Sequence, residues 1–385
     1  MSELEWINSY GFLGIRLFDF PNLLICMLLV VVLGYRYKVP NNYQIVLFLH
    51  CLIPFALNYV LFDPSYMPDQ FRYLKGVYAI RSGDLGLIEA LIDPGNVLQA
   101  SAMLSLIPLT SPVSVISIGF YNTFLYIILF FVLYNKRVFT QLSIWFYLAF
   151  PSVALYSALS LRETLIFFFM VLTIVYARES KPLQSSLCLF PLYLIKFQNF
   201  FMLAPIVAMY FLFKVAKNGM SIGKSIMIGL ISIMGLILSA PLAIPLINKF
   251  RISMYAEDGG NPHEIQAISG IVDFIAQGLS SGIYFLFKPF IWEANGFLPF
   301  IQSLENTVIL ILLFLITRQA WKKSPDRLTF WLLFMALSMS VYGLVVFNYG
   351  TAVRYRYPFV IIYVLFVCVD CNIQKLSPKA NNKNL

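Results

Sequence analysis

The chain has 385 residues, of which 60% are hydrophobic and only 12% are charged, and its mean hydropathy is +0.79. A soluble domain carries roughly 25% charged residues, so this composition excludes an ordinary soluble protein and indicates an integral membrane protein. The net charge of +9 is explained by Lys and Arg in cytoplasmic loops, and we expect no nucleic-acid partner.

Long apolar runs recur along nearly the whole chain. They are continuous rather than alternating, which predicts membrane-spanning helices and not a barrel. We predict an all-α, polytopic bundle of about eleven spans that forms a single membrane domain over 1–385. The predicted spans centre on 12–33, 43–62, 113–134, 138–157, 161–177, 183–197, 199–213, 225–247, 303–319, 328–347 and 357–372.

Charge predicts the orientation of this bundle. Lys and Arg gather in alternate short loops, such as those containing Lys136 and Lys322, and the positive-inside rule places these loops in the cytoplasm. The two long connections, approximately 63–112 and 248–302, then lie on the outer side. Any chemistry is expected on that side.

The first long connection contains Asp69-Gln70-Phe71-Arg72-Tyr73. If it is helical, Asp69, Arg72 and Tyr73 share one face. Such a face suits a sugar, because the carboxylate can accept from hydroxyls and the aromatic ring can stack. The alternative is an amphipathic helix that lies in the membrane interface, and the spacing does not decide between them.

Two later motifs, which contain Arg162 and Lys196, place charged residues between apolar stretches. Ionisable groups near or inside a membrane are costly and usually have a partner or a function, so we expect Arg162 to be functional. The alternative is that Arg162 and Glu163 cap a tight outer turn. Lys196 is interpreted as an interface lysine, with contact to a phosphate as the alternative.

The second long connection contains His263 and Lys288-Pro289-Phe290-Ile291-Trp292-Glu293. His263 is a candidate general base, with a solvated loop histidine as the alternative. Glu293 is a second candidate.

The last predicted span opens with Arg354-Tyr355-Arg356-Tyr357-Pro358. Arginine forks match phosphate oxygens two at a time, so Arg354 and Arg356 are expected to matter more than any outer lysine. The tyrosines fit either an interfacial aromatic belt or a sugar platform.

In order and topology, these motifs resemble bacterial polysaccharide polymerases of the O-antigen polymerase (Wzy) and EpsG-like kind. The resemblance rests on 69–73, on Ser160-Leu161-Arg162-Glu163, on 288–293 followed by Glu305, and on 354–358. It implies a multi-pass, GT-C-like glycosyltransferase of the bacterial inner membrane that needs no metal or other cofactor. Where such families often show a histidine, this chain has Lys196-Phe197-Gln198, which leaves the identity of the base open.

The resemblance implies that undecaprenyl-pyrophosphate-linked oligosaccharides are joined into the O-antigen of lipopolysaccharide or a related surface polysaccharide. Membrane lipids and a chain-length regulator protein are the other expected partners. The expected catalytic residues are Asp69, Glu293 and His263. The expected substrate-binding residues are Arg72, Tyr73, Arg162, Glu163, Arg354, Tyr355 and Arg356.

Two alternatives stay open. A related GT-C glycosyltransferase or an O-antigen ligase would use the same face and similar arginines. A transporter or flippase of lipid-linked sugars would instead place polar groups near the middle of the bilayer, whereas here they lie mostly at span ends.

Overall fold

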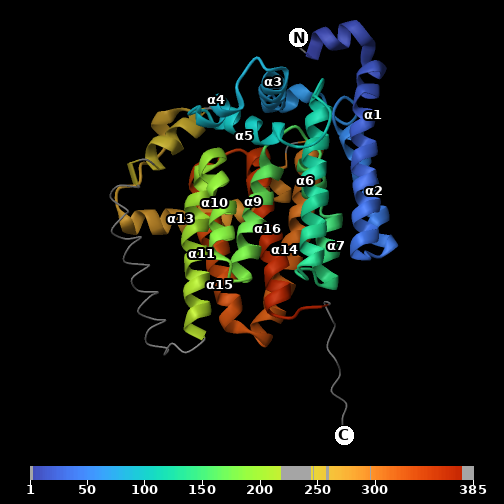
Figure 1. The fold of residues 1–385 in the computed structure, drawn as a ribbon. Coiled ribbons are helices and arrows are strands. Elements are labelled where there is room, and N and C mark those ends of the chain that lie inside the picture. The colour runs from blue at the N-terminus through green and yellow to red at the C-terminus, as the bar shows by residue number, and fades with distance from the viewer. Residues whose placement is uncertain (1–2, 218–243, 246, 257–259, 295, 375–385) are drawn as a thin grey trace. The chain divides into compact units, whose positions relative to one another are not determined.

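The computed structural model describes residues 3–217, 244–245, 247–256, 260–294 and 296–374, which are almost entirely helical and contain no β-strand (Figure 1). Its longer helices are α1 (Glu3–Tyr37), α2 (Asn41–Leu57), α3 (Asp69–Ser82), α4 (Leu87–Ile92), α5 (Asn96–Ser105), α6 (Val115–Asn135), α7 (Gln141–Ala149), α8 (Pro151–Tyr156), α9 (Glu163–Arg178), α10 (Pro182–Ile195), α11 (Phe197–Lys217), α13 (Ile271–Phe287), α14 (Phe297–Lys323), α15 (Pro325–Val345) and α16 (Tyr349–Asp370). Three short 3-10 helices accompany them: η1 (Pro64–Tyr66), η2 (Pro262–Glu264) and η3 (Ile291–Glu293).

Five helices in the described part of the chain are long and apolar enough to cross a membrane. They are Arg16–Tyr37, Val115–Asn135, Pro299–Lys323, Pro325–Val345 and Tyr349–Asp370. Together with the shorter apolar helices α2, α10 and α13, they make the chain a helical, multi-pass membrane protein. The predicted span 225–247 lies almost wholly outside the described residues, so the total of eleven stays a prediction.

The predicted span 138–157 is two helices rather than one. Phe150 has an extended backbone, and Pro151 begins α8. Proline disfavours a helical conformation in the residue before it and is well suited to the first position of a new helix. The break therefore follows from the Phe150-Pro151 step.

Both long connections are largely helical. The segment 63–112 contains α3, α4 and α5. The segment 248–302 contains α13, a 17-residue apolar helix in a region predicted as a connection outside the spans.

The contacts divide the chain into two compact units. Unit 1 comprises 1–138 and 147–204, and unit 2 comprises 139–146 and 205–385. In unit 1, α6 packs against α1, α2 and α9, and α10 packs against α9. The short helices α3, α4 and α5 lie together at one end of these helices, where α3 contacts α6 and α5 contacts α10 (Figure 1).

In unit 2, α15 packs closely on α13 and α16, and α14 packs on α16. Two glycines permit the close approach of α13 and α15. A Cβ on Gly282 would lie 2.8 Å from the Cα of Ser340, and a Cβ on Gly343 would lie 2.4 Å from the carbonyl carbon of Ser281. Small residues at such crossings let helix backbones pack directly in a membrane.

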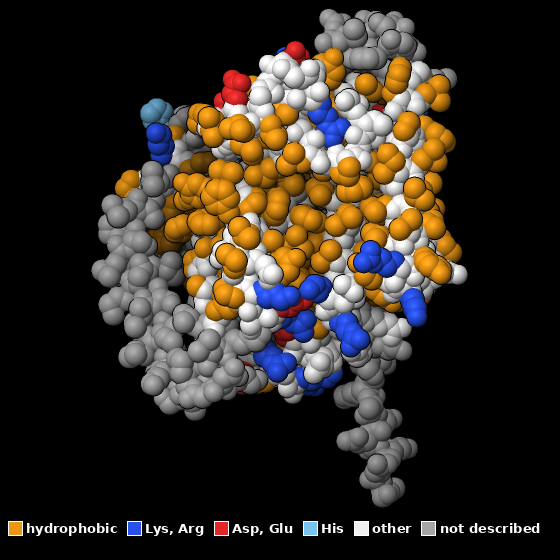
Figure 2. All heavy atoms as spheres, in the orientation of Figure 1, with side chains coloured by type: hydrophobic (Ala, Val, Ile, Leu, Met, Phe, Trp, Pro, Cys, Tyr) orange, Lys and Arg blue, Asp and Glu red, His pale blue; other side chains and the backbone are white. Residues whose placement is uncertain are grey.

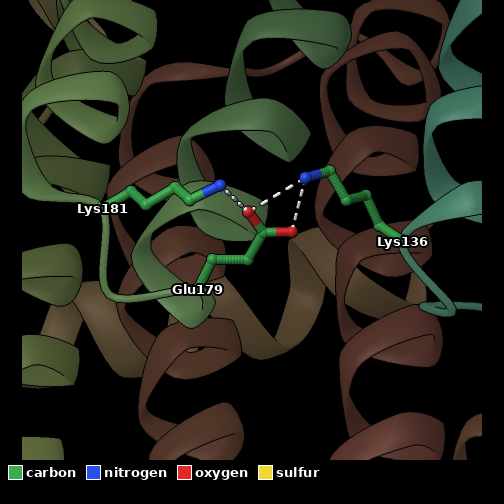
Figure 3. Close-up of polar contacts among 3 residues, drawn as sticks. All are labelled: Lys136, Glu179 and Lys181. Carbon is green, nitrogen blue, oxygen red and sulfur yellow. Dashed lines mark hydrogen bonds and ion pairs between the residues drawn. The ribbon is translucent and has the colours of Figure 1, made fainter.

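The lower end of unit 1 is basic. Glu179 accepts from Lys136 at 2.7 Å and from Lys181 at 2.9 Å (Figure 3). Burial raises the pKa of Glu179, but the hydrogen bonds from both lysines outweigh it and leave that pKa below its ordinary value. Figure 2 shows Lys and Arg side chains below the hydrophobic face on which α10 lies, an arrangement typical of a membrane boundary.

Candidate functional site

Unit 1 contains a buried, non-helical segment, residues 157–162, between α8 and α9. Every residue from 156 to 167 is buried, including Arg162 and Glu163. At membrane depth, irregular backbone is tolerated only where protein surrounds it or where it lines a cavity, because its polar groups need partners. This segment, which we call the α8–α9 break, is therefore the first candidate for a site.

Side chains of α6 satisfy the carbonyl groups of the α8–α9 break. Asn122 donates to the carbonyls of Leu159 and Leu161, each at 2.6 Å. Thr123 donates to the carbonyl of Ser157 at 3.2 Å. These hydrogen bonds fix the conformation of the break from one side.

Gln70 joins the break to α3. Its amide oxygen accepts from the backbone N–H of Ser160 at 3.2 Å, and its carbonyl accepts from the Ser160 hydroxyl at 3.0 Å. The Gln70 amide also pairs reciprocally with that of Asn58, at 3.0 and 3.1 Å. The structure thus brings the motif at 69–73 together with the motif at 160–163, about ninety residues later in the chain.

Arg162 lies at the end of this break and is only 8% exposed. Its Nη1 donates to the carbonyl of Ile195 at 3.0 Å, whereas its buried Nε has no hydrogen-bond partner among the described residues. Glu163, the first residue of α9, is buried beside it. Lys196 directly follows Ile195 and is also buried, so the expectation that it snorkels to the interface is wrong.

Asp69, Arg72 and Tyr73, the residues of α3 that were predicted as site residues, do not share one exposed face. Asp69 and Arg72 form an ion pair at 3.3 Å, with side chains 36% and 71% exposed. Tyr73 is only 2% exposed and packs in the interior. Asp69 therefore remains an accessible carboxylate, one residue before Gln70, while Tyr73 offers no open ring to a ligand.

His50 supports the same break, a role that is not predicted from its sequence context. It is buried, with its Nε2 2.8 Å from the Ser157 hydroxyl oxygen and its ring stacked on Tyr126 at 3.9 Å. Tyr126 in turn stacks on Tyr147 at 4.7 Å. The signal available in the sequence was a polar side chain within an apolar run, which in a membrane helix usually has a partner.

In unit 2, three buried cations bind backbone carbonyls at helix ends. Nη1 of Arg356 donates to the carbonyls of Phe285 at 2.9 Å and Leu286 at 2.8 Å in the last turn of α13, and to that of Lys288 at 2.7 Å. The ammonium of Lys288 donates to the carbonyl of Val346 at 2.7 Å, just after α15. Arg251 also donates to the end of α15, at Leu344. These contacts complement the exposed carbonyls and the negative dipole of a helix C-terminus.

The remaining predicted residues of unit 2 differ in accessibility. Arg354 is partly exposed, with its guanidinium 5.7 Å from the ring centre of Tyr355. Glu293 accepts from the Tyr284 hydroxyl at 3.0 Å and from the backbone N–H of Phe290 at 3.0 Å. His263 is exposed in η2.

Comparison of the chain with protein-family models, with curated proteins and with solved structures finds no match.

Proposed function

We propose that the protein is a polysaccharide polymerase, which joins lipid-linked oligosaccharide repeat units at the outer face of the bacterial inner membrane. The observation that carries this proposal is the α8–α9 break. An arginine with an unused buried donor and a second buried cation, Lys196, lie at a break in the helices, and α3, which carries the accessible carboxylate of Asp69, is hydrogen-bonded to this break.

The chemistry needs cations more than it needs an acid. The acceptor hydroxyl oxygen attacks the anomeric carbon of the donor sugar, the bond from that carbon to the pyrophosphate oxygen breaks, and the hydroxyl proton passes to a base. The negative charge that develops on the pyrophosphate is stabilised by preorganised donors. Arg162 is well placed for this role, because its Nε is already desolvated and uncommitted.

Asp69 is the base that the geometry of unit 1 favours. It begins α3, whose next residue, Gln70, is hydrogen-bonded to the break. A partly exposed carboxylate in an ion pair keeps lone pairs with which it can accept the proton of a substrate hydroxyl. Its ion-pair partner Arg72 would then orient the carboxylate.

Arg354 and Arg356, the two arginines of the last motif, are proposed to have different roles. Nη1 of Arg356 already serves three carbonyls, so Arg354 is the arginine of α16 that we keep as a phosphate-binding candidate in unit 2, while the pyrophosphate is assigned to Arg162 in unit 1. The metal-independent, GT-C-like character of the enzyme belongs to the same proposal and rests on the motifs alone.

Deletion of the gene, followed by gel analysis of the surface polysaccharide, is the decisive experiment. We expect the ladder of chain lengths to collapse to single repeat units. Arg162→Ala should lower the polymerisation rate by on the order of 100-fold, as loss of a preorganised donor usually does, whereas Arg36→Ala, at the exposed end of α1, should have no effect.

Other results would select other functions. An unchanged ladder in the deletion strain would refute the proposal. Loss of a complete polymer from lipid A core would indicate a ligase, and addition of one sugar per acceptor would indicate a related transferase. Flux of lipid-linked sugar into vesicles without polymer would indicate a flippase.

A further inference from the structure

The turn that follows α13 in unit 2, residues 288–293, is held in place from several sides. Lys288 is anchored through its ammonium to the end of α15, and its carbonyl accepts from Arg356. From α14, Ser303 donates to the carbonyl of Phe290 at 3.2 Å, and Asn306 donates to that of Phe287 at 2.5 Å. All four of these polar side chains are buried.

This rigid turn presents an indole and a carboxylate. Trp292 is 79% exposed, although one face of its ring stacks on Phe290 with centroids 4.6 Å apart and planes 9° apart. Its opposite face is therefore open. The neighbouring Glu293 is fixed by the Tyr284 hydroxyl and the N–H of Phe290, and its two oxygens keep lone pairs for further donors.

An open aromatic face beside an oriented carboxylate matches one class of ligand. A pyranose ring has a flat patch of C–H groups that packs on an aromatic face, and its hydroxyls donate to carboxylate oxygens. Phosphate is disfavoured, because the exposed group is negative and the nearby ammonium of Lys288 is buried on carbonyls.

We infer that Trp292 and Glu293 form a subsite for a neutral sugar of the acceptor glycan, with Trp292 as the stacking platform. This inference rests on the proposed polymerase function and gives Glu293 a binding role in place of the catalytic one expected from the sequence. A membrane anchor would need the indole alone. Four buried polar side chains that fix the turn, and a carboxylate beside the ring, favour a ligand that requires defined geometry.

The test uses substrate from the deletion strain, since a strain without the polymerase accumulates its own lipid-linked repeat unit. The full-length protein in lipid nanodiscs is assayed with a fixed amount of this extract as donor and increasing amounts of the repeat-unit oligosaccharide, released from its lipid by mild acid, which can act only as acceptor. The variants are Trp292→Leu, which keeps an apolar side chain without a ring, Trp292→Phe, which keeps a ring, and Glu293→Gln. Trp321→Leu is the matched control, because Trp321 on α14 is also an exposed tryptophan of unit 2.

We expect Trp292→Leu to raise the KM for acceptor about tenfold or more with kcat retained, Trp292→Phe to have a smaller effect, and Glu293→Gln to raise KM. Trp321→Leu should match the wild type. If Trp292→Leu and Glu293→Gln leave KM unchanged, or if Trp321→Leu is equally impaired, the subsite is wrong while the polymerase stands. A loss of kcat alone in Glu293→Gln would return that residue to catalysis. If the deletion strain keeps its ladder, the polymerase itself is wrong.

Discussion

Arg356 provides the sharpest test of whether an arginine in the last helix binds substrate or holds the fold. In Arg356→Ala, the carbonyls of Phe285, Leu286 and Lys288 lose the donor that they share in a buried site. One nitrogen carries two hydrogens, so we count two charge-assisted hydrogen bonds, each worth about 1.5–3 kcal/mol. The expected loss in the free energy of unfolding is roughly 3–6 kcal/mol, a large share of the ~5–15 kcal/mol that stabilises a typical protein.

The measurement is thermal unfolding of the purified protein in detergent, next to polymerisation in membranes. We expect the Tm of Arg356→Ala to fall by at least about 5 °C, with activity lost in proportion to the folded protein. Arg354→Ala, two residues earlier on α16, is the matched control and should lose less stability and more activity per folded molecule. If Arg356→Ala keeps the wild-type Tm and loses polymerisation, its guanidinium binds substrate and does not stabilise the helix end.

Two further predictions concern packing and charge. Gly343→Ala places a methyl against the backbone of Ser281, so we expect a loss of about 1–3 kcal/mol in thermal unfolding. Gly278→Ala, whose methyl would meet only ordinary contacts at 3.6 Å or more in the same crossing, should not destabilise; equal effects would contradict the close crossing of α13 and α15. Because the pKa of Glu179 is lowered in the folded state, its contribution is present above the ordinary value of 4.5 and is lost as pH falls through the lowered pKa. The difference in Tm between wild type and Glu179→Gln should therefore shrink on acidification, and a difference that persists after protonation would show that charge is not responsible.

Much of the helical framework followed from apolar runs. Spans such as 113–134 and 328–347 are predicted within a few residues of α6 and α15, because continuous apolar sequence of that length has one stable conformation in lipid. The pattern failed for α13. Its apolar residues are interrupted by Asp273 and by small residues such as Gly278 and Gly282, which look like loop sequence until the close partner α15 is known.

The charged residues of the candidate site could be predicted from the sequence, but the hydrogen bonds that connect its segments could not. Arg162 and Asp69 stand out because charge is rare in this chain. The link between their motifs depends on hydrogen bonds made by the side chains of Gln70 and Asn122. Nothing in the local sequence shows whether such an amide is buried and hydrogen-bonded to a distant segment or is simply an exposed polar residue. Long-range hydrogen bonds leave no periodic signal, so burial and partner could come only from the fold.

The α8–α9 break also has a consequence for biogenesis. A non-helical stretch of backbone cannot enter lipid while its carbonyls lack hydrogen-bond donors. Its donors must therefore already be in the membrane when it leaves the translocation machinery. The side chains that serve the backbone of residues 157–161 come from Gln70 on α3 and from Asn122 and Thr123 on α6, all earlier in the chain. The residues that hydrogen-bond to the break are thus synthesised before the break itself. This part of unit 1 can therefore assemble in the direction of translation.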